Sequence, residues 1–215
     1  MSRSPEGAAA LLAKARAAGD DLEARLLVAA AVSEAGREVG ARVVVTGGTA
    51  ADFYATSAVG TSAAYPALWR PSGDIDVIVL AIGTWTPARE ALVARLRELG
   101  MVPRGARALD VPGVPFYVEI VADELGSRAR EERTMTVLLD GTTPLELRSP
   151  ENVILAYAES GWHLRHTGDW TRALAVFAAM KERLDLAWMR NEAERRGQTE
   201  ALERVLAMKP LRGAP

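Results

Sequence analysis

Two acidic residues stand two positions apart at the start of an apolar run, in the segment Arg70-Pro71-Ser72-Gly73-Asp74-Ile75-Asp76-Val77-Ile78-Val79-Leu80. Side chains of an extended strand alternate between its two faces, so Asp74 and Asp76 point to the same side. Two like charges held this close repel each other unless a cation lies between them. Mg²⁺ is usually bound by one or two carboxylates together with substrate phosphates, so the pair predicts nucleotide chemistry at a metal ion.

A glycine pair precedes these acids along the chain. Gly47-Gly48-Thr49 lies between an expected strand over 42–46 and a short expected helix over 49–55. Glycines let the backbone turn sharply and bring its N–H groups close to an anion. The helix N-terminus adds partial positive charge, and Thr49 adds a hydroxyl donor. The segment therefore predicts a phosphate-binding turn.

A third acid lies in a later strand. Glu119 interrupts an apolar run over 116–121 and shares one strand face with Tyr117 and Val121. A carboxylate placed there is costly when buried unless it is paired or bound to a metal. Asp123 lies on the same alternation and is the alternative third acid. The competing interpretation of Glu119 is that it forms a salt bridge on an exposed face of the sheet. The competing interpretation of Asp74 and Asp76 is that they lie in a solvated turn.

Together these features are what metal-dependent phosphoryl transfer requires, because two divalent ions can hold the attacking and leaving oxygens of an in-line displacement. In that arrangement Asp76 bridges the ions and Asp74 completes the ion that holds a triphosphate. Glu119 completes the ion that activates the attacking hydroxyl.

The elements that must position these residues follow from periodicity and from capping signals. We expect helices over 5–18, 21–37, 87–99, 150–160, 170–186 and 199–207, and strands over 42–46, 74–80, 101–109, 116–121 and 134–139. The stretch 56–72 contains two prolines and predicts a loop. The order predicts an α+β fold: a mixed β-sheet flanked by helices, with a C-terminal helical region.

Composition limits the expected binding partners and the expected cellular location. The chain has 215 residues, of which 49% are hydrophobic, and a net charge of -2, so nothing in the balance demands a nucleic acid or a membrane. The absence of cysteine excludes disulfides and thiolate metal sites. The first residues lack the apolar core of a signal peptide, and no stretch is long and uncharged enough to span a bilayer. We expect a soluble cytoplasmic protein.

The pattern over about residues 40–170 resembles the DNA polymerase beta-like nucleotidyltransferase superfamily, and within it bacterial proteins of the AbiEii toxin type and their relatives. Those proteins have a strand, Gly-Gly, a short helix, Arg-x-Thr-x-Asp-x-Asp and a third strand acid. The matching residues here are Gly47, Gly48, Arg70, Ser72, Asp74, Asp76 and Glu119. Ser149-Pro150-Glu151-Asn152 is similar to a helix start that is common in the same family.

The resemblance implies transfer of a nucleoside monophosphate from an NTP to a hydroxyl, with Mg²⁺ or Mn²⁺ as cofactor. It implies that Gly47, Gly48, Thr49, Arg70 and Ser72 contact the nucleotide. From the order of elements along the chain we also expect a nucleotidyltransferase-like core with N-terminal helices over 1–146, a helical region over 147–208 and a disordered tail over 209–215. The acceptor could be a protein side chain, a small molecule or RNA, and a cognate protein partner of toxin–antitoxin type is an expectation.

Two departures support a second hypothesis. Relatives often carry a lysine where this chain has Tyr157, and a second acid where it has Arg172. A nucleotidyltransferase fold that binds a nucleotide or a partner without catalysis is therefore the alternative function.

Two further hypotheses are weaker. A dinucleotide-binding fold would need a third glycine soon after Gly48, where Ala51, Asp52 and Phe53 stand instead. His163 and His166 have no other expected ligands nearby, so a solvated or capping role is favoured over zinc.

Overall fold

The computed structural model describes residues 7–57, 72–80, 85–121, 133–164 and 167–208. The chain divides into two units, one of Met1–Thr49 with Ser72–Arg148 and the other of Ala50–Pro71 with Ser149–Pro215. The three segments expected from the sequence, 1–146, 147–208 and 209–215, stay a prediction, and the last lies outside the described residues.

Two helices open the first unit. They are α1, Ala8–Ala17, and α2, Asp21–Glu38. The Asp20 carboxylate accepts a hydrogen bond of 2.9 Å from the Glu23 backbone N–H, which satisfies one of the free donors at the start of α2. The middle of α2 is apolar all round and almost fully buried, so this helix lies inside the unit.

A seven-stranded mixed sheet forms the centre of the first unit, with strand order β3-β4-β5-β2-β1-β7-β6. Its strands are β1 Arg42–Val45, β2 Asp74–Leu80, β3 Val102–Pro103, β4 Ala108–Asp110, β5 Tyr117–Val121, β6 Thr134–Leu139 and β7 Thr143–Arg148. β2 runs parallel to β5 and antiparallel to β1, and β1 runs parallel to β7. The expected α+β fold with a mixed sheet flanked by helices is confirmed.

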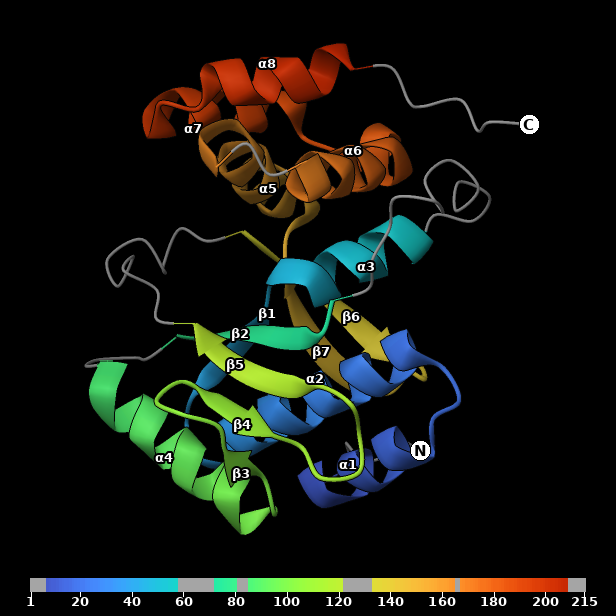
Figure 1. The fold of residues 1–215 in the computed structure, drawn as a ribbon, viewed down its shortest axis with the longest axis vertical. Coiled ribbons are helices and arrows are strands. Elements are labelled where there is room, and N and C mark those ends of the chain that lie inside the picture. The colour runs from blue at the N-terminus through green and yellow to red at the C-terminus, as the bar shows by residue number, and fades with distance from the viewer. Residues whose placement is uncertain (1–6, 58–71, 81–84, 122–132, 165–166, 209–215) are drawn as a thin grey trace. The chain divides into compact units, whose positions relative to one another are not determined.

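One face of this sheet is covered by helices (Figure 1). α2 packs against β1, β7 and β2, and α4, Trp85–Glu98, packs against β2 and α2. The strands turn apolar side chains toward them, and Ile75, Val77, Val118, Ile120 and Leu147 are all fully buried. Burial of each such side chain contributes about 1.5–3 kcal/mol relative to leaving it exposed. The core therefore fixes which residues of β2 and β5 point to the opposite face.

The second unit is helical. It contains α5 Pro150–Leu164, α6 Thr167–Met180, α7 Leu186–Arg196 and α8 Thr199–Ala207, with the residues of α3, Gly47–Ser57, from Ala50 onward. Ser149 caps α5 by accepting the Asn152 N–H at 3.4 Å, and Pro150 occupies the first helical position, as expected. α5 packs against α6, α7 and α8, so it is the central helix of this unit.

The structure corrects four expectations about elements. The expected strand over 101–109 is two short antiparallel strands, β3 and β4, joined by a turn. The strand β7 was not expected. The short helix expected over 49–55 begins two residues earlier, so Gly47 and Gly48 form the first turn of α3 rather than a turn before it. The helix expected over 170–186 ends at Met180 and is followed by the short 3₁₀ helix η2, Lys181–Arg183.

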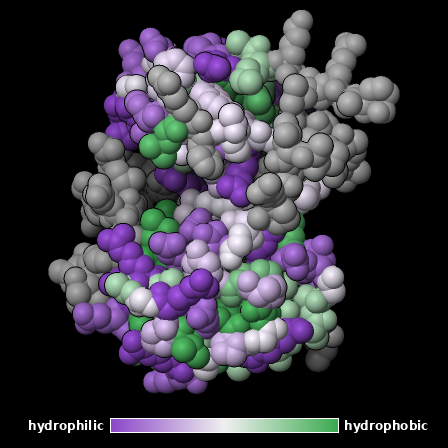
Figure 2. Space-filling model, in the orientation of Figure 1, coloured by the Kyte–Doolittle hydropathy of each residue, from purple (hydrophilic) through white to green (hydrophobic). Residues whose placement is uncertain are grey.

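The visible face of the sheet-containing unit mixes hydrophilic and hydrophobic side chains (Figure 2). The large hydrophobic side chains that are exposed in this unit are Val102, at 51%, and Leu138, at 59%, among the described residues. No described helix combines the length and the apolar character needed to cross a membrane.

Candidate active site

Asp74 and Asp76 occupy the first and third positions of β2. Their neighbours Ile75 and Val77 are fully buried, whereas both acids are half-buried. This alternation follows from the pleat of the strand, which turns every second side chain away from the helices. The expectation that both acids point to one side of a sheet is confirmed.

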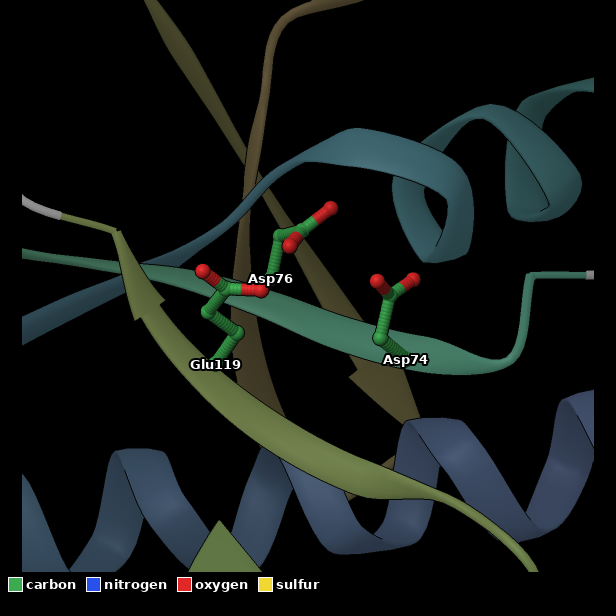
Figure 3. A group of neighbouring side chains, drawn as sticks. All are labelled: Asp74, Asp76 and Glu119. Atoms are coloured by element: carbon green, nitrogen blue, oxygen red, sulfur yellow. The ribbon is translucent and has the colours of Figure 1, made fainter. Parts of the chain in front are cut away.

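Glu119 joins the two aspartates across the sheet. β2 and β5 pair in parallel, and their register places Glu119 directly opposite Asp76. One carboxylate oxygen from each of Asp74, Asp76 and Glu119 lies within 4.8 Å of the other two. Figure 3 shows the three side chains rising from the same side of the two strands. The sequence-predicted triad is therefore one cluster.

This cluster fits a hard divalent cation. It offers carboxylate oxygens only, which are the ligands that Mg²⁺ and Mn²⁺ prefer. All three side chains are half-buried, so their mutual repulsion is screened less than at a fully exposed surface. A bound cation would remove that repulsion and hold the acids together.

The glycine turn approaches these acids closely. Gly47 has φ +58°, in the left-handed region that favours glycine. A Cβ atom on it would lie 1.8 Å from Oδ2 of Asp76. A Cβ atom on Gly48 would lie 2.3 Å from Oγ of Ser72. The missing side chains thus leave the room that Asp76 and Ser72 occupy beside the start of α3.

Thr49 is fully buried and braces the strand that carries the acids. Its Oγ1 donates a hydrogen bond of 3.2 Å to the backbone carbonyl of Asp74. The backbone N–H of Thr46 donates one of 2.9 Å to the carbonyl of Asp76. These bonds tie the start of α3 to β2. The Thr49 hydroxyl is used within the chain, which leaves backbone N–H groups as the donors of this turn.

Both carboxylate oxygens of Asp74 accept hydrogen bonds from hydroxyl groups. The Ser72 hydroxyl donates to Oδ1 at 2.5 Å, and the Tyr117 hydroxyl donates to Oδ2 at 3.3 Å. The negative charge of Asp74 raises the pKa of Tyr117, and burial adds to the effect. The phenol therefore stays protonated and able to donate.

The role of Tyr117 was not predicted from the sequence. The signal that could have found it was its place two residues before Glu119, on the same face of the strand. The Arg104 guanidinium covers the Tyr117 ring at 4.5 Å from its centroid, and Arg104 pairs with Asp110 at 3.2 Å. Cation–π contact and the ion pair together restrict the ring.

Several sequence-predicted residues lie elsewhere. Arg70, Asp123 and His166 are outside the described residues, so their predicted roles stay predictions. His163 is exposed near the end of α5. In the helical unit, the Arg172 guanidinium lies 5.5 Å from the centroid of the Tyr157 ring, so the two departures from the family pattern contact each other.

Among the comparisons with known proteins, one with a solved structure supports this architecture. No protein-family model matches the chain, and no curated protein matches it. A crystal structure of an antigenic nucleotidyltransferase-like protein from Paracoccidioides brasiliensis matches with a TM-score of 0.51 and 13% identity, over 83% of this chain and 92% of that one. The solution structure of the antibiotic-resistance factor ANT(2'')-Ia gives a TM-score of 0.48 and 19% identity, over 80% and 91%.

At these identities a structural likeness concerns the fold and leaves the activity to the site itself. The first of the two matches spans most of both chains, and the mixed sheet carries its acids on two adjacent parallel strands. The chain has a nucleotidyltransferase-like fold.

Proposed function

We propose that this chain is a metal-dependent nucleotidyltransferase, which moves a nucleoside monophosphate from an NTP to a hydroxyl and releases pyrophosphate. One observation carries the proposal: the carboxylates of Asp74, Asp76 and Glu119 lie within 4.8 Å of one another on adjacent strands. The fold supports it, because a nucleotidyltransferase-like protein has the same architecture.

Asp74, Asp76 and Glu119 would hold Mg²⁺ or Mn²⁺. Such ions supply charge neutralisation at the phosphates and lower the pKa of the attacking hydroxyl. Asp76 lies between the other two acids, because it is two residues after Asp74 on β2 and directly opposite Glu119 on β5. This central position suits the Asp76 carboxylate to share in metal binding with both Asp74 and Glu119.

The triphosphate would lie against the start of α3. Gly47 and Gly48 lack the side chains that would block approach, and the first N–H groups of a helix have no partner within it. The helix dipole adds about half a positive charge at this end. Thr49 would contribute its backbone N–H, Arg70 is proposed as a clamp on the phosphates, and Ser72 would act through Asp74.

The reaction needs little covalent participation by the protein. The oxygen of the acceptor hydroxyl bonds to the α-phosphorus, the bond from that phosphorus to pyrophosphate breaks, and the hydroxyl proton leaves to solvent. Positioning and electrostatic stabilisation therefore supply most of the rate. Within this proposal the chain acts in the cytoplasm.

The acceptor in this proposal is a protein side chain, a small molecule or RNA. A net charge of -2 gives no general attraction to a polyanion, so a large nucleic acid is the least favoured of these. A cognate protein partner is part of the same proposal.

The test is pyrophosphate release from labelled NTPs with Mg²⁺ or Mn²⁺, in the presence of each acceptor class. Asp76→Asn should abolish the release, because it removes the central charge of the cluster. Glu98→Gln is the matched control, since Glu98 is an exposed acid on α4 that pairs with Arg95. Equal release by wild type and Asp76→Asn would overturn the proposal.

The alternative is a nucleotidyltransferase fold that binds a nucleotide or a partner without catalysis. The contact between Arg172 and Tyr157 favours it, because these two positions depart from the family pattern together. Metal-dependent NTP binding without pyrophosphate release from any acceptor class would support this second function.

A further inference from the structure

The two oxygens of one carboxylate are held from two different segments. Ser72 precedes β2 and donates to Oδ1 of Asp74, whereas Tyr117 opens β5 and donates to Oδ2. The sheet register places Asp74 directly opposite Tyr117. The second bond therefore crosses between the strands that carry the acidic cluster.

The Tyr117 ring is itself held in place. The guanidinium of Arg104 covers one side of it, and Asp110, which lies opposite Tyr117 in the β4–β5 pair, accepts from that guanidinium at 3.2 Å. The Arg104 backbone N–H donates to the carbonyl of Ala108 at 2.8 Å, which fixes the turn before β4. A chain of contacts thus runs from β4 through Arg104 and Tyr117 to Asp74.

We propose that Tyr117 is a positioning residue, which orients Asp74 for metal binding with Ser72 on the other oxygen and Arg104 behind the ring. This inference rests on the proposed function, since it assigns a role toward the same cation. It concerns a residue that the acidic triad and the glycine turn do not include.

The physical reason lies in the geometry of a carboxylate. Each of its oxygens has two lone pairs, so a hydroxyl donor on each oxygen still leaves one lone pair per oxygen for a cation. Two donors on opposite oxygens stop rotation about the Cβ–Cγ bond. A ligand fixed in this way loses less freedom on binding, and loss of such an outer contact typically weakens metal binding or activity about 10–100-fold.

The test compares Tyr117→Phe with Tyr157→Phe by calorimetric titration of Mn²⁺ alone. The control is matched, because Tyr157 also has an arginine, Arg172, over its ring but lies on α5 rather than in the acidic cluster. We expect Tyr117→Phe to weaken Mn²⁺ binding about tenfold, at the low end for an outer contact because its bond is long. We expect Tyr157→Phe to bind Mn²⁺ as wild type does.

The rate of pyrophosphate release distinguishes a role of Tyr117 in positioning Asp74 from general damage to the fold. In Tyr117→Phe, saturating Mn²⁺ should restore most of the pyrophosphate release lost at low Mn²⁺, because the triad itself is intact. Arg104→Gln leaves the hydroxyl in place but frees the ring, so it should weaken binding by a smaller factor. It also serves as the second variant if Tyr117→Phe does not fold.

The outcomes are distinct. Unchanged Mn²⁺ affinity in both Tyr117→Phe and Arg104→Gln would overturn the positioning role and leave the proposed function standing. Lost turnover that saturating Mn²⁺ does not restore would also count against positioning. A wild-type protein that binds no Mn²⁺ would overturn the proposed function, and this inference with it.

Discussion

Asp76 and Glu119 face each other across the parallel pair of β2 and β5, and their carboxylates lie within 4.8 Å. The adjacent pair in the register, Ile75 and Val118, is fully buried on the opposite face. A slip of one residue in either strand would place a carboxylate in the apolar core, where it costs several kcal/mol. The core therefore fixes the geometry of the candidate site.

A cation that binds this cluster should stabilise the folded chain. Mn²⁺ at about 100 times its dissociation constant adds about 2.7 kcal/mol of folding free energy, which corresponds to a rise in Tm of about 5–10 °C for a chain of this size. Asp76→Asn should lose that rise. Without metal, the same variant should be as stable as wild type or more so, because one of three repelling charges is gone.

Thermal unfolding with and without Mn²⁺ checks this prediction, and Glu98→Gln should keep the full rise because its carboxylate lies on α4. An equal rise in Asp76→Asn would show that Mn²⁺ binds elsewhere.

Gly47 should not tolerate a side chain. In Gly47→Ala the new Cβ meets the Asp76 carboxylate, and φ +58° is strained for alanine. Strain and overpacking together should lower the free energy of unfolding by about 2–4 kcal/mol and displace Asp76, which weakens Mn²⁺ binding. Chemical unfolding and metal titration measure the two effects.

Gly40→Ala separates these causes. Gly40 has φ +72° but nothing lies within 4 Å of its Cβ position, so strain alone should cost about 1 kcal/mol and leave Mn²⁺ binding unchanged. If both variants lost the same stability and neither lost metal affinity, the close approach of Gly47 to Asp76 would have no consequence.

Much of the fold could be predicted from local pattern. The start of α2 follows from its Asp20 cap, and α5 follows from Ser149 and Pro150. β7 was missed because Pro144 and two charged residues interrupt its apolar run. Its alternation was present nonetheless, since Thr143, Leu145 and Leu147 are buried and the residues between them are half-buried. Strand order depends on long-range pairing, which a single sequence does not display.

In the candidate site, too, the residues could be predicted from local sequence, whereas the contacts across strands could not. The two aspartates and the glycine pair were predicted from spacing, because their chemistry is encoded within a few residues. Glu119 was also predicted as the third acid, although its partnership with Asp76 requires β5 to lie beside β2, which no local signal specifies. Tyr117 and Arg104 were missed because their contacts run across strands, and an arginine or a tyrosine near a strand is ordinary in sequence.

The helical unit should lose stability at low pH through Glu192. Hydrogen bonds from Arg195 and then Arg196 lower the pKa of Glu192 to about 2, and Arg196 also donates to Asn152 of α5 at 2.9 Å. Because the folded pKa lies below the usual value of 4.5, this contribution is complete above about pH 4.5. It disappears as the pH falls from there to about 2.

Glu192→Gln should therefore cost about 2 kcal/mol at pH 7, as for hydrogen bonds to a charged group, and little at pH 2. Urea unfolding across that range is the measurement. Glu203→Gln is the control: Glu203 pairs with Arg190 on the exposed surface and should change stability by less than about 0.5 kcal/mol. A cost for Glu192→Gln that does not shrink with pH would contradict the assignment.

Glu119 offers the sharpest test of which acids bind the cation. Glu119→Gln keeps the size of the side chain but removes its charge, so Mn²⁺ affinity should fall by more than about 100-fold, beyond the range for outer contacts. Glu119→Asp keeps the charge on a side chain one methylene shorter, so it should retain more affinity than Glu119→Gln. In calorimetric titration, we expect the Mn²⁺ affinity to be highest for wild type, lower for Glu119→Asp and lowest for Glu119→Gln. If all three bind Mn²⁺ equally, the cation is held without Glu119, and Asp123 becomes the third acid to replace next.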